Sequence, residues 1–217
     1  KNNIFIQTSN LDYNAEDLFH TTYGRLEYNV KKNNYDTQYG VDIYKESVSG
    51  SIILNNGSDI HKFALFSKLE LNLLSKIITQ IGVRIPYHSI YSAPISPSIH
   101  LNYILSPTLQ FRGSYARGFR APTIKELFME FIDLNHYIYG NPDLDAEYSH
   151  SFQLSSSWTL LRRSNIYCQL KIESFMNFLE NKIQLAEIQE SMSPVNPYVY
   201  YNLSNSKYYG FSFNINT

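Results

Sequence analysis

The sequence alternates apolar and polar residues with a period of two over most of its length, a pattern that predicts β-strands. Within 77–87, for example, Ile81 and Val83 fall on one face, and Gln80 and Arg84 fall on the other. The pattern predicts about ten strands in meander order. Their expected positions are 1–9, 17–31, 35–47, 61–73, 75–87, 97–104, 107–118, 146–161, 165–183 and 198–216.

The connections between these strands alternate in length along the chain. Short connections are expected near 31–34, 73–75, 104–107 and 161–165. Long connections are expected near 10–16, 48–60, 87–97, 119–145 and 184–197. Short turns on one rim and long loops on the other are typical of outer-membrane barrels. The sequence therefore favours an all-β fold, an antiparallel up-and-down transmembrane β-barrel. A soluble β-sandwich stays open as the alternative.

The composition agrees with a barrel but does not require one. The chain carries 19 Tyr and 13 Phe, and only 17% of its residues are charged, against about 25% in ordinary soluble domains. Aromatic girdles at the two membrane interfaces would account for this content, although an extracellular β-sandwich has a similar composition. No stretch approaches the roughly 18 apolar residues of a spanning helix. The net charge of −1 gives no reason to expect nucleic acid as a partner.

In a transmembrane barrel the apolar face of each strand is turned to lipid and the polar face to the lumen. The residues expected to face lipid are Leu69, Leu71, Ile81, Val83, Leu109, Phe111, Phe211 and Phe213. The residues expected to face the lumen are Lys68, Glu70, Gln80, Arg84, Gln110 and Arg112.

Two proline-containing boxes, Phe119-Arg120-Ala121-Pro122 and Asn141-Pro142-Asp143-Leu144, interrupt the alternation between two strands. The first proline holds the preceding residue in an extended conformation and ends strand pairing. Thr123 with Glu126 three residues later predicts a capped helical turn. On these grounds the boxes are places where the chain leaves and rejoins the strand ladder.

The two boxes, with His136 between them, resemble the barrel signature of TonB-dependent outer-membrane receptors. Loosely matching segments such as QYGVDIYKES and YYNLSNSKYYGFSFNI occur in the family's order. Such receptors have 22 strands and a plugged lumen. The resemblance implies that residues 1–217 are one partial barrel domain, incomplete at both ends and without the plug, in the bacterial outer membrane. It also implies the partners: the TonB complex acting through a plug, outer-membrane lipid, and a surface lipoprotein or haemophore.

His136 suggests the haem-uptake branch of that family, because neutral imidazole is a common ligand of haem iron. The ligand-binding loop expected from the resemblance comprises Phe119, Arg120, Pro122, His136, Tyr137, Tyr139, Asn141, Pro142 and Leu144. Haem would be the transported ligand, with no intrinsic cofactor and no metal site. Packing or solvation of a Tyr-rich loop explains His136 equally well.

No nucleophile elbow, phosphate-binding glycine loop or paired metal motif points to an enzyme. The resemblance implies an energy-coupled importer of haem or another iron-containing compound. A siderophore or cobalamin receptor of the same family is one alternative, and a surface β-sandwich adhesin is another.

Overall fold

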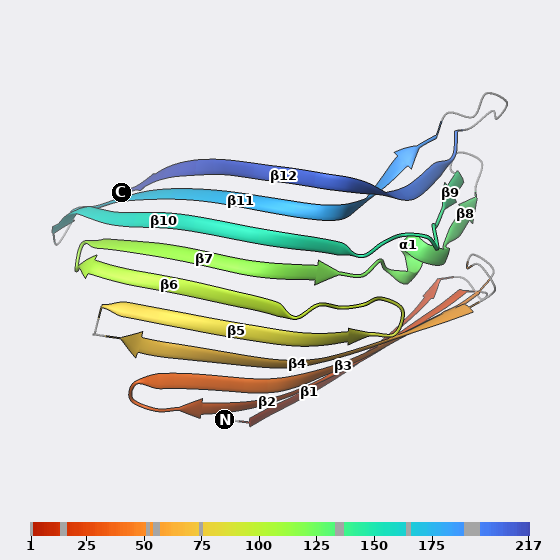
Figure 1. Cartoon of the computed structure of the whole chain (residues 1–217), viewed down its shortest axis with the longest axis horizontal. Coiled ribbons are helices and arrows are strands. Elements are labelled where there is room, and N and C mark those ends of the chain that lie inside the picture. Colours follow the sequence, from red (N-terminus) through yellow and green to blue (C-terminus); the bar gives the residue numbers. More distant parts are fainter. Residues whose placement is uncertain are drawn as a thin grey trace.

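The computed structural model describes residues 2–13, 17–50, 53, 57–73, 76–132, 137–163, 166–188 and 196–217. Ten long strands dominate this part of the chain (Figure 1). They are β1 (Asn2–Tyr13), β2 (Asp17–Lys31), β3 (Tyr35–Ser49), β4 (Gly57–Leu73), β5 (Ile77–His88), β6 (Ser96–Ser106), β7 (Leu109–Arg120), β10 (Glu147–Arg163), β11 (Ile166–Glu187) and β12 (Tyr198–Asn216). Three short elements lie between β7 and β10: α1 (Ile124–Phe128), β8 (Glu130–Ile132) and β9 (Tyr137–Tyr139).

The ten long strands form one antiparallel sheet in which each strand pairs with the next long strand along the chain. The predicted all-β meander is therefore confirmed. The β-sandwich alternative is wrong, because the ten long strands make a single sheet in sequence order, and the described strands form no second sheet.

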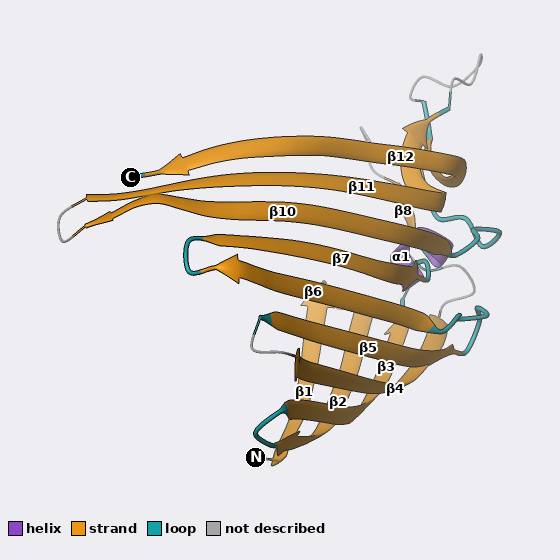
Figure 2. Ribbon diagram, turned by 60° about the vertical axis from the view of Figure 1, so that its left-hand side comes forward, coloured by secondary structure: helices purple, strands orange, loops and turns teal. Residues whose placement is uncertain are grey.

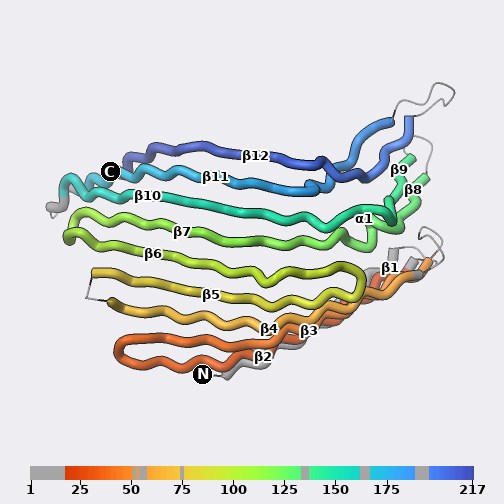
Figure 3. The backbone as a smooth tube through the Cα atoms, viewed as in Figure 1, coloured from red at the N-terminus to blue at the C-terminus, as the bar shows by residue number. Residues whose placement is uncertain are grey.

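The connections at the two ends of the sheet differ in length (Figure 3). Short turns join β2 to β3, β4 to β5, β6 to β7 and β10 to β11 at one end, and the segment 121–146 joins β7 to β10 at the other. Two expected long connections, 10–16 and 48–60, are shorter than predicted, because the strands on either side run further toward the loop end. Polar residues such as Asn10 still pair with the neighbouring strand, since the ladder is made by backbone groups whatever the side chain.

The sheet is strongly curved, as twisted strands require. Figure 2 shows β1 to β4 turning behind the other strands, which gives the sheet a concave and a convex face. Polar residues at the predicted lumenal positions Glu70, Gln80 and Arg112 line a hollow on the concave side. The apolar residues expected to face lipid lie at the alternating positions, and several are largely exposed on the convex side. Those with exposed side chains are Ile81, Val83, Phe111, Phe211 and Phe213. The structure thus separates the two sets as predicted.

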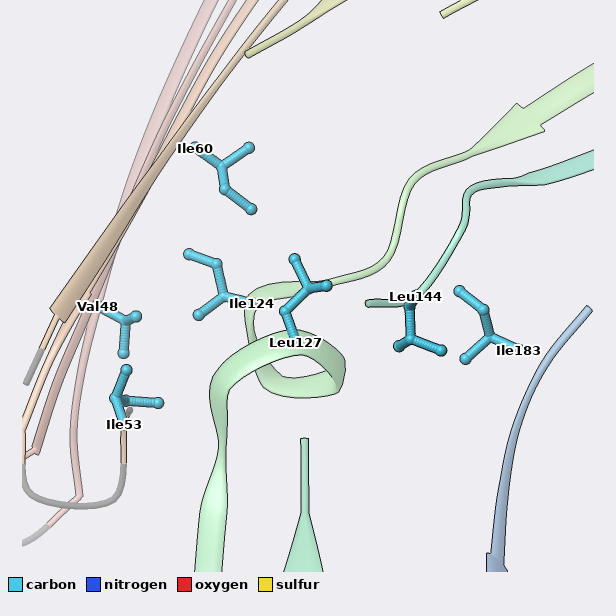
Figure 4. Packing of buried hydrophobic residues seen from close by; sticks show 7 residues of the cluster. All are labelled: Val48, Ile53, Ile60, Ile124, Leu127, Leu144 and Ile183. Carbon is cyan, nitrogen blue, oxygen red and sulfur yellow. The ribbon is translucent and has the colours of Figure 1, made fainter. Parts of the chain in front are cut away.

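The buried cluster of the molecule lies at the loop end, not along the strands. Ile124 and Leu127 of α1 are fully buried between the two walls of the curved sheet (Figure 4). The other members of the cluster are Val48, Ile53, Ile60, Leu144 and Ile183. In the described part of the chain, no helix is long and apolar enough to cross a membrane.

Candidate ligand-binding loop and barrel mouth

The segment after β7 begins with the predicted capped helix. The hydroxyl of Thr123 accepts a hydrogen bond from the backbone N–H of Glu126 (3.2 Å), and the carboxylate of Glu126 accepts one from the N–H of Thr123 (2.7 Å). This reciprocal pair is a capping box. The helix has one apolar side, and the burial of Ile124 and Leu127 holds it against the concave face of the sheet. The predicted helical turn is confirmed.

Arg120 ties the first box to α1 and β10, and Glu147 extends the connection to β11. Its Nε lies 2.6 Å from a carboxylate oxygen of Glu147, at the start of β10, and its Nη1 lies 2.9 Å from a carboxylate oxygen of Glu126 in α1. The second oxygen of Glu147 accepts a hydrogen bond from the backbone N–H of Ile183 on β11 (2.6 Å). Charge-assisted bonds of this kind are among the stronger ones. The guanidinium predicted to contact a ligand therefore bonds to protein carboxylates, which join the loop to the strand ladder.

The second box is also held by hydrogen bonds within the protein. The side-chain oxygen of Asn141 accepts a hydrogen bond from the N–H of Asp143 (2.9 Å), which closes a turn around Pro142. The side-chain amide of Asn141 donates a hydrogen bond to the carbonyl of Tyr200 on β12 (3.0 Å). Asn141 also donates its backbone N–H to the carbonyl of Glu126 (2.8 Å). The two boxes consequently meet on α1.

Gly140 allows the backbone before the second box to lie directly against α1. A Cβ at this position would lie 2.7 Å from the backbone of Leu127 and Phe128, closer than any side chain tolerates. Its N–H donates to the carbonyl of Met129 (2.6 Å). The backbone of the box therefore approaches the helix directly, and only glycine leaves room for it.

Leu144 closes the second box. Its side chain is buried, and its carbonyl accepts a hydrogen bond from the hydroxyl of Tyr91 (2.8 Å), in the loop between β5 and β6. Burial raises the pKa of the Tyr91 phenol to about 12, with further contributions from the carboxylates of Asp145 and Glu126. Tyr91 is thus a neutral donor at physiological pH, and it links two loops of the rim.

Two of the predicted ligand-contacting aromatics lie on a small sheet at the rim. Tyr137 and Tyr139 are the ends of β9, which pairs antiparallel with β8 and parallel with the start of β12. Both side chains are half-buried. The sequence did not indicate this parallel pair, because three-residue strands carry no detectable period. His136 lies outside the described residues, so its predicted role stays a prediction.

A charged cluster on the concave face was missed by the sequence reasoning. The buried carboxylate of Asp42 accepts hydrogen bonds from Nε and Nη2 of Arg25 (2.6 and 3.0 Å) and from Nη1 of Arg84 (2.6 Å). Both guanidinium groups lie over the ring of Phe66, at 5.2 and 6.0 Å from its centroid, a cation–π arrangement. That ring covers Gly40, where a Cβ would overlap it. Four strands, β2 to β5, bring these residues together, so no single segment of sequence could reveal them.

The cluster borders a hollow of about 450 Å³ under the rim, on whose wall Lys62, His88, Arg120 and Thr123 also lie. Two guanidinium groups share one carboxylate in this cluster, so it has the charge and the donors to attract an anionic group. Among the described residues, no group of three or more His, Cys, Asp or Glu side chains is placed to hold a metal ion.

Comparisons with known proteins agree with this architecture. Residues 2–217 match the family described as TonB dependent receptor-like, beta-barrel. Over 151 residues, 67% of this chain and 22% of the relative, the chain is 26% identical to the iron-regulated outer membrane virulence protein of Vibrio cholerae. Over 95 residues, 43% of this chain and 8% of the relative, it is 35% identical to the hemoglobin and hemoglobin-haptoglobin-binding protein C of Haemophilus influenzae.

Among solved structures, the siderophore receptor PirA of Pseudomonas aeruginosa is similar, with a TM-score of 0.73 and 20% identity. The likeness covers 92% of this chain and 39% of that one, and at this identity it shows the fold alone. The chain thus spans about a fifth or less of the two curated relatives.

Proposed function

Because the chain belongs to the TonB-dependent receptor β-barrel family, which is located in the bacterial outer membrane, we propose that it forms part of the wall and mouth of an energy-coupled importer of iron compounds. The match over residues 2–217 carries the proposal. The names of the relatives, an iron-regulated outer-membrane protein and a haemoglobin-binding protein, support iron compounds as the cargo. The chain would act as a receptor, with no reaction of its own.

The loop 121–146 would receive the ligand, and the two boxes would set its shape. Phe119, Arg120 and Pro122 lead into the helix, and Asn141, Pro142 and Leu144 lead out of it. The side chains of Arg120 and Asn141 are bonded within the protein, and Pro122 and Leu144 are buried. We therefore assign these residues to the frame of the loop, and we assign contact with the ligand to the segment between them.

For that segment the first candidate cargo is haem. His136 would ligate haem iron through its imidazole, and Tyr137 or Tyr139 would cover the porphyrin face. The haemoglobin-binding name of one relative supports this assignment. Haem would then be a transported ligand and not a cofactor, and a haemophore or a surface lipoprotein would be the donor.

A ferric siderophore is the second candidate, and one feature of the structure favours it. Arg25 and Arg84 share Asp42 beneath the rim, and such a cluster suits the negative charge of a ferric chelate. In this case His136 would be incidental. In both cases the TonB complex would supply energy through a plug domain, in keeping with the family.

The test is growth of an iron-starved, receptor-deleted strain that carries the complete receptor. Haem, haemoglobin and ferric siderophores are supplied in turn as the sole iron source, for wild type and for His136→Ala. His61→Ala is the matched control, because His61 is exposed on β4 and alternates with the buried Ile60, so its side chain is directed away from α1. We expect His136→Ala to abolish growth on haem and to change the haem absorption spectrum, while the control changes neither.

Three other outcomes are informative. Unchanged growth and an unchanged spectrum for His136→Ala remove His136 from the site. Wild-type growth on a siderophore but not on haem selects the second candidate. A receptor that supports growth on none of these iron sources contradicts the importer proposal.

A further inference from the structure

A row of basic side chains crosses the convex face near the loop end, where iron import does not require it. Arg117 on β7 pairs with His150 on β10, His150 with Phe178 on β11, and Phe178 with Lys207 on β12. These four residues therefore stand side by side across four neighbouring strands, and we refer to them as the outer basic row. We propose that the outer basic row binds the phosphate of an anionic lipid headgroup in the leaflet on the loop side of the membrane.

Side-chain contacts place the row on the convex face. The Tyr115 hydroxyl lies 2.9 Å from Nδ1 of His150, and the Tyr115 ring lies 5.0 Å from that of Phe152. Phe152 in turn contacts Phe178 edge to face at 6.3 Å, and Nζ of Lys207 lies 5.0 Å from the centre of the Phe178 ring. These aromatic residues continue along their strands into the exposed apolar residues that are directed outward.

The order of residues along the strands sets the depth of the row. On β7 and β10, the outward-facing positions read from the loop end are an aromatic residue, a basic residue and a second aromatic residue: Phe119, Arg117, Tyr115 and Tyr148, His150, Phe152. On β12, Lys207 is followed by Tyr209 and Phe211. Aromatic girdles mark the membrane interface in such barrels, and two residues along a strand cover roughly 6.8 Å. The outer basic row therefore lies within the aromatic girdle at the loop end, at the level of the membrane interface.

Among the side chains that the structure describes, the outward positions nearest the short turns differ from the row. At the short-turn end, the corresponding outward positions hold Leu109, Trp158 and Ile215. Beside the row, Glu180 on β11 is an outward-facing acid. With Arg117 and Lys207 charged, the row keeps a net positive charge without counting His150. Such a surface complements a phosphate, and acyl chains attached to that phosphate would lie along the apolar residues below.

Arg117 supplies an independent observation. Its Nε is buried and has no hydrogen-bond partner in the described part of the protein. Buried donors are almost always bonded, so no carboxylate of the described protein occupies this nitrogen, and a guanidinium can bind a phosphate through two of its N–H groups. A lipid is favoured over free phosphate, because the site continues directly into the apolar band. The inference rests on the outer-membrane location and is independent of the transported compound.

The test measures lipid binding to the complete receptor in detergent micelles by native mass spectrometry. The probes are diphosphorylated lipid A, the same lipid without phosphates, and inorganic phosphate alone. The variant is Arg117→Gln with Lys207→Gln. The matched control is Arg112→Gln with Lys171→Gln, which removes the same charges from the concave side of β7 and β11. Arg117→Lys, which keeps the charge, is the second variant, and heat-dependent gel mobility verifies that each protein is folded.

We expect wild type and the control to bind the phosphorylated lipid in preference to the other two probes. The double variant should lose about 30-fold in affinity for it, equivalent to about 2 kcal/mol for two basic residues, and Arg117→Lys should lose far less. Equal binding of the phosphorylated and phosphate-free lipids by wild type overturns the proposal, as does an equal loss in the concave-face control. Retention of inorganic phosphate as tightly as the lipid would instead make the row a site for the free ion and contradict a lipid occupant.

Discussion

Replacement of Ile124 by Ala tests whether apolar burial holds the rim loop in place. Ile124 is fully buried, between Ile60 on one wall of the sheet and Leu127 within α1. Removing such a side chain costs about 2–5 kcal/mol through lost burial and a residual cavity. The barrel strands keep their own ladders, so the cost falls on local opening of the loop. A cost of about 3 kcal/mol raises the open population about 150-fold.

Trypsin reports this opening directly, because Lys125 is the one Lys or Arg between residues 121 and 146 and lies within α1. Cleavage there requires the helix to unfold, and when reclosing is fast the rate follows the open population. We therefore expect Ile124→Ala to raise the cleavage rate after Lys125 by about two orders of magnitude. Each variant is also digested after denaturation, which corrects for any change in the preference of the protease.

Ile132→Ala is the matched control, since the same residue type in the same loop is 58% exposed. Its cost should stay below about 1 kcal/mol, which corresponds to less than about a fivefold change in cleavage. Comparable rates for the two variants, or no acceleration by Ile124→Ala, would show that the loop is held by something other than the apolar cluster.

Three further predictions concern the cap, the rim and the membrane face. Thr123→Ala removes half of the capping box and should destabilise the closed loop by about 1 kcal/mol, seen as about fivefold faster cleavage after Lys125. Thr123→Ser should keep the wild-type rate, and an unchanged rate for Thr123→Ala would contradict the role of the cap. Because the pKa of Tyr91 rises from 10.0 to about 12 on folding, its contribution to loop closure should be constant below pH 10 and decline as the pH rises from 10 toward 12. Digestion with a protease active up to pH 11 should show this decline in wild type and not in Tyr91→Phe, and equal pH profiles would refute it. Val83→Arg should lower the free energy of unfolding by about 2–4 kcal/mol if Val83 lies at mid-bilayer, measured by denaturant titration of the receptor folded into vesicles. Gln80→Arg, on the concave face of β5, should lower it far less, and equal stability of the two variants would place Val83 outside the bilayer.

Most of the fold could be predicted because its information is local. A period of two identifies each strand from its own residues, and the same period assigns Val83 and Gln80 to opposite faces. Strand ends were less predictable. β3 and β4 run further toward the loop end than expected, because backbone pairing continues through polar residues that interrupt the apolar pattern.

The candidate site was predicted in outline only. The two boxes and the cap at Thr123 carry recognisable local signals. The bonds of Arg120 to Glu126 and Glu147 depend on how the loop folds back onto β10, which no local pattern encodes. The sharing of Asp42 by Arg25 and Arg84 depends on the register of separate strands, so it too was invisible before the structure.

The sequence by itself therefore determined the strands, their order and which side chains face each way, because alternation and turn residues act over a few positions. Tertiary structure decided what those faces bring together. Curvature of the sheet placed α1 against residues from both walls, and strand register aligned Arg117, His150 and Lys207 into one row. Register and curvature arise from pairing between distant segments, and side-chain proximity across strands follows only once that pairing is set.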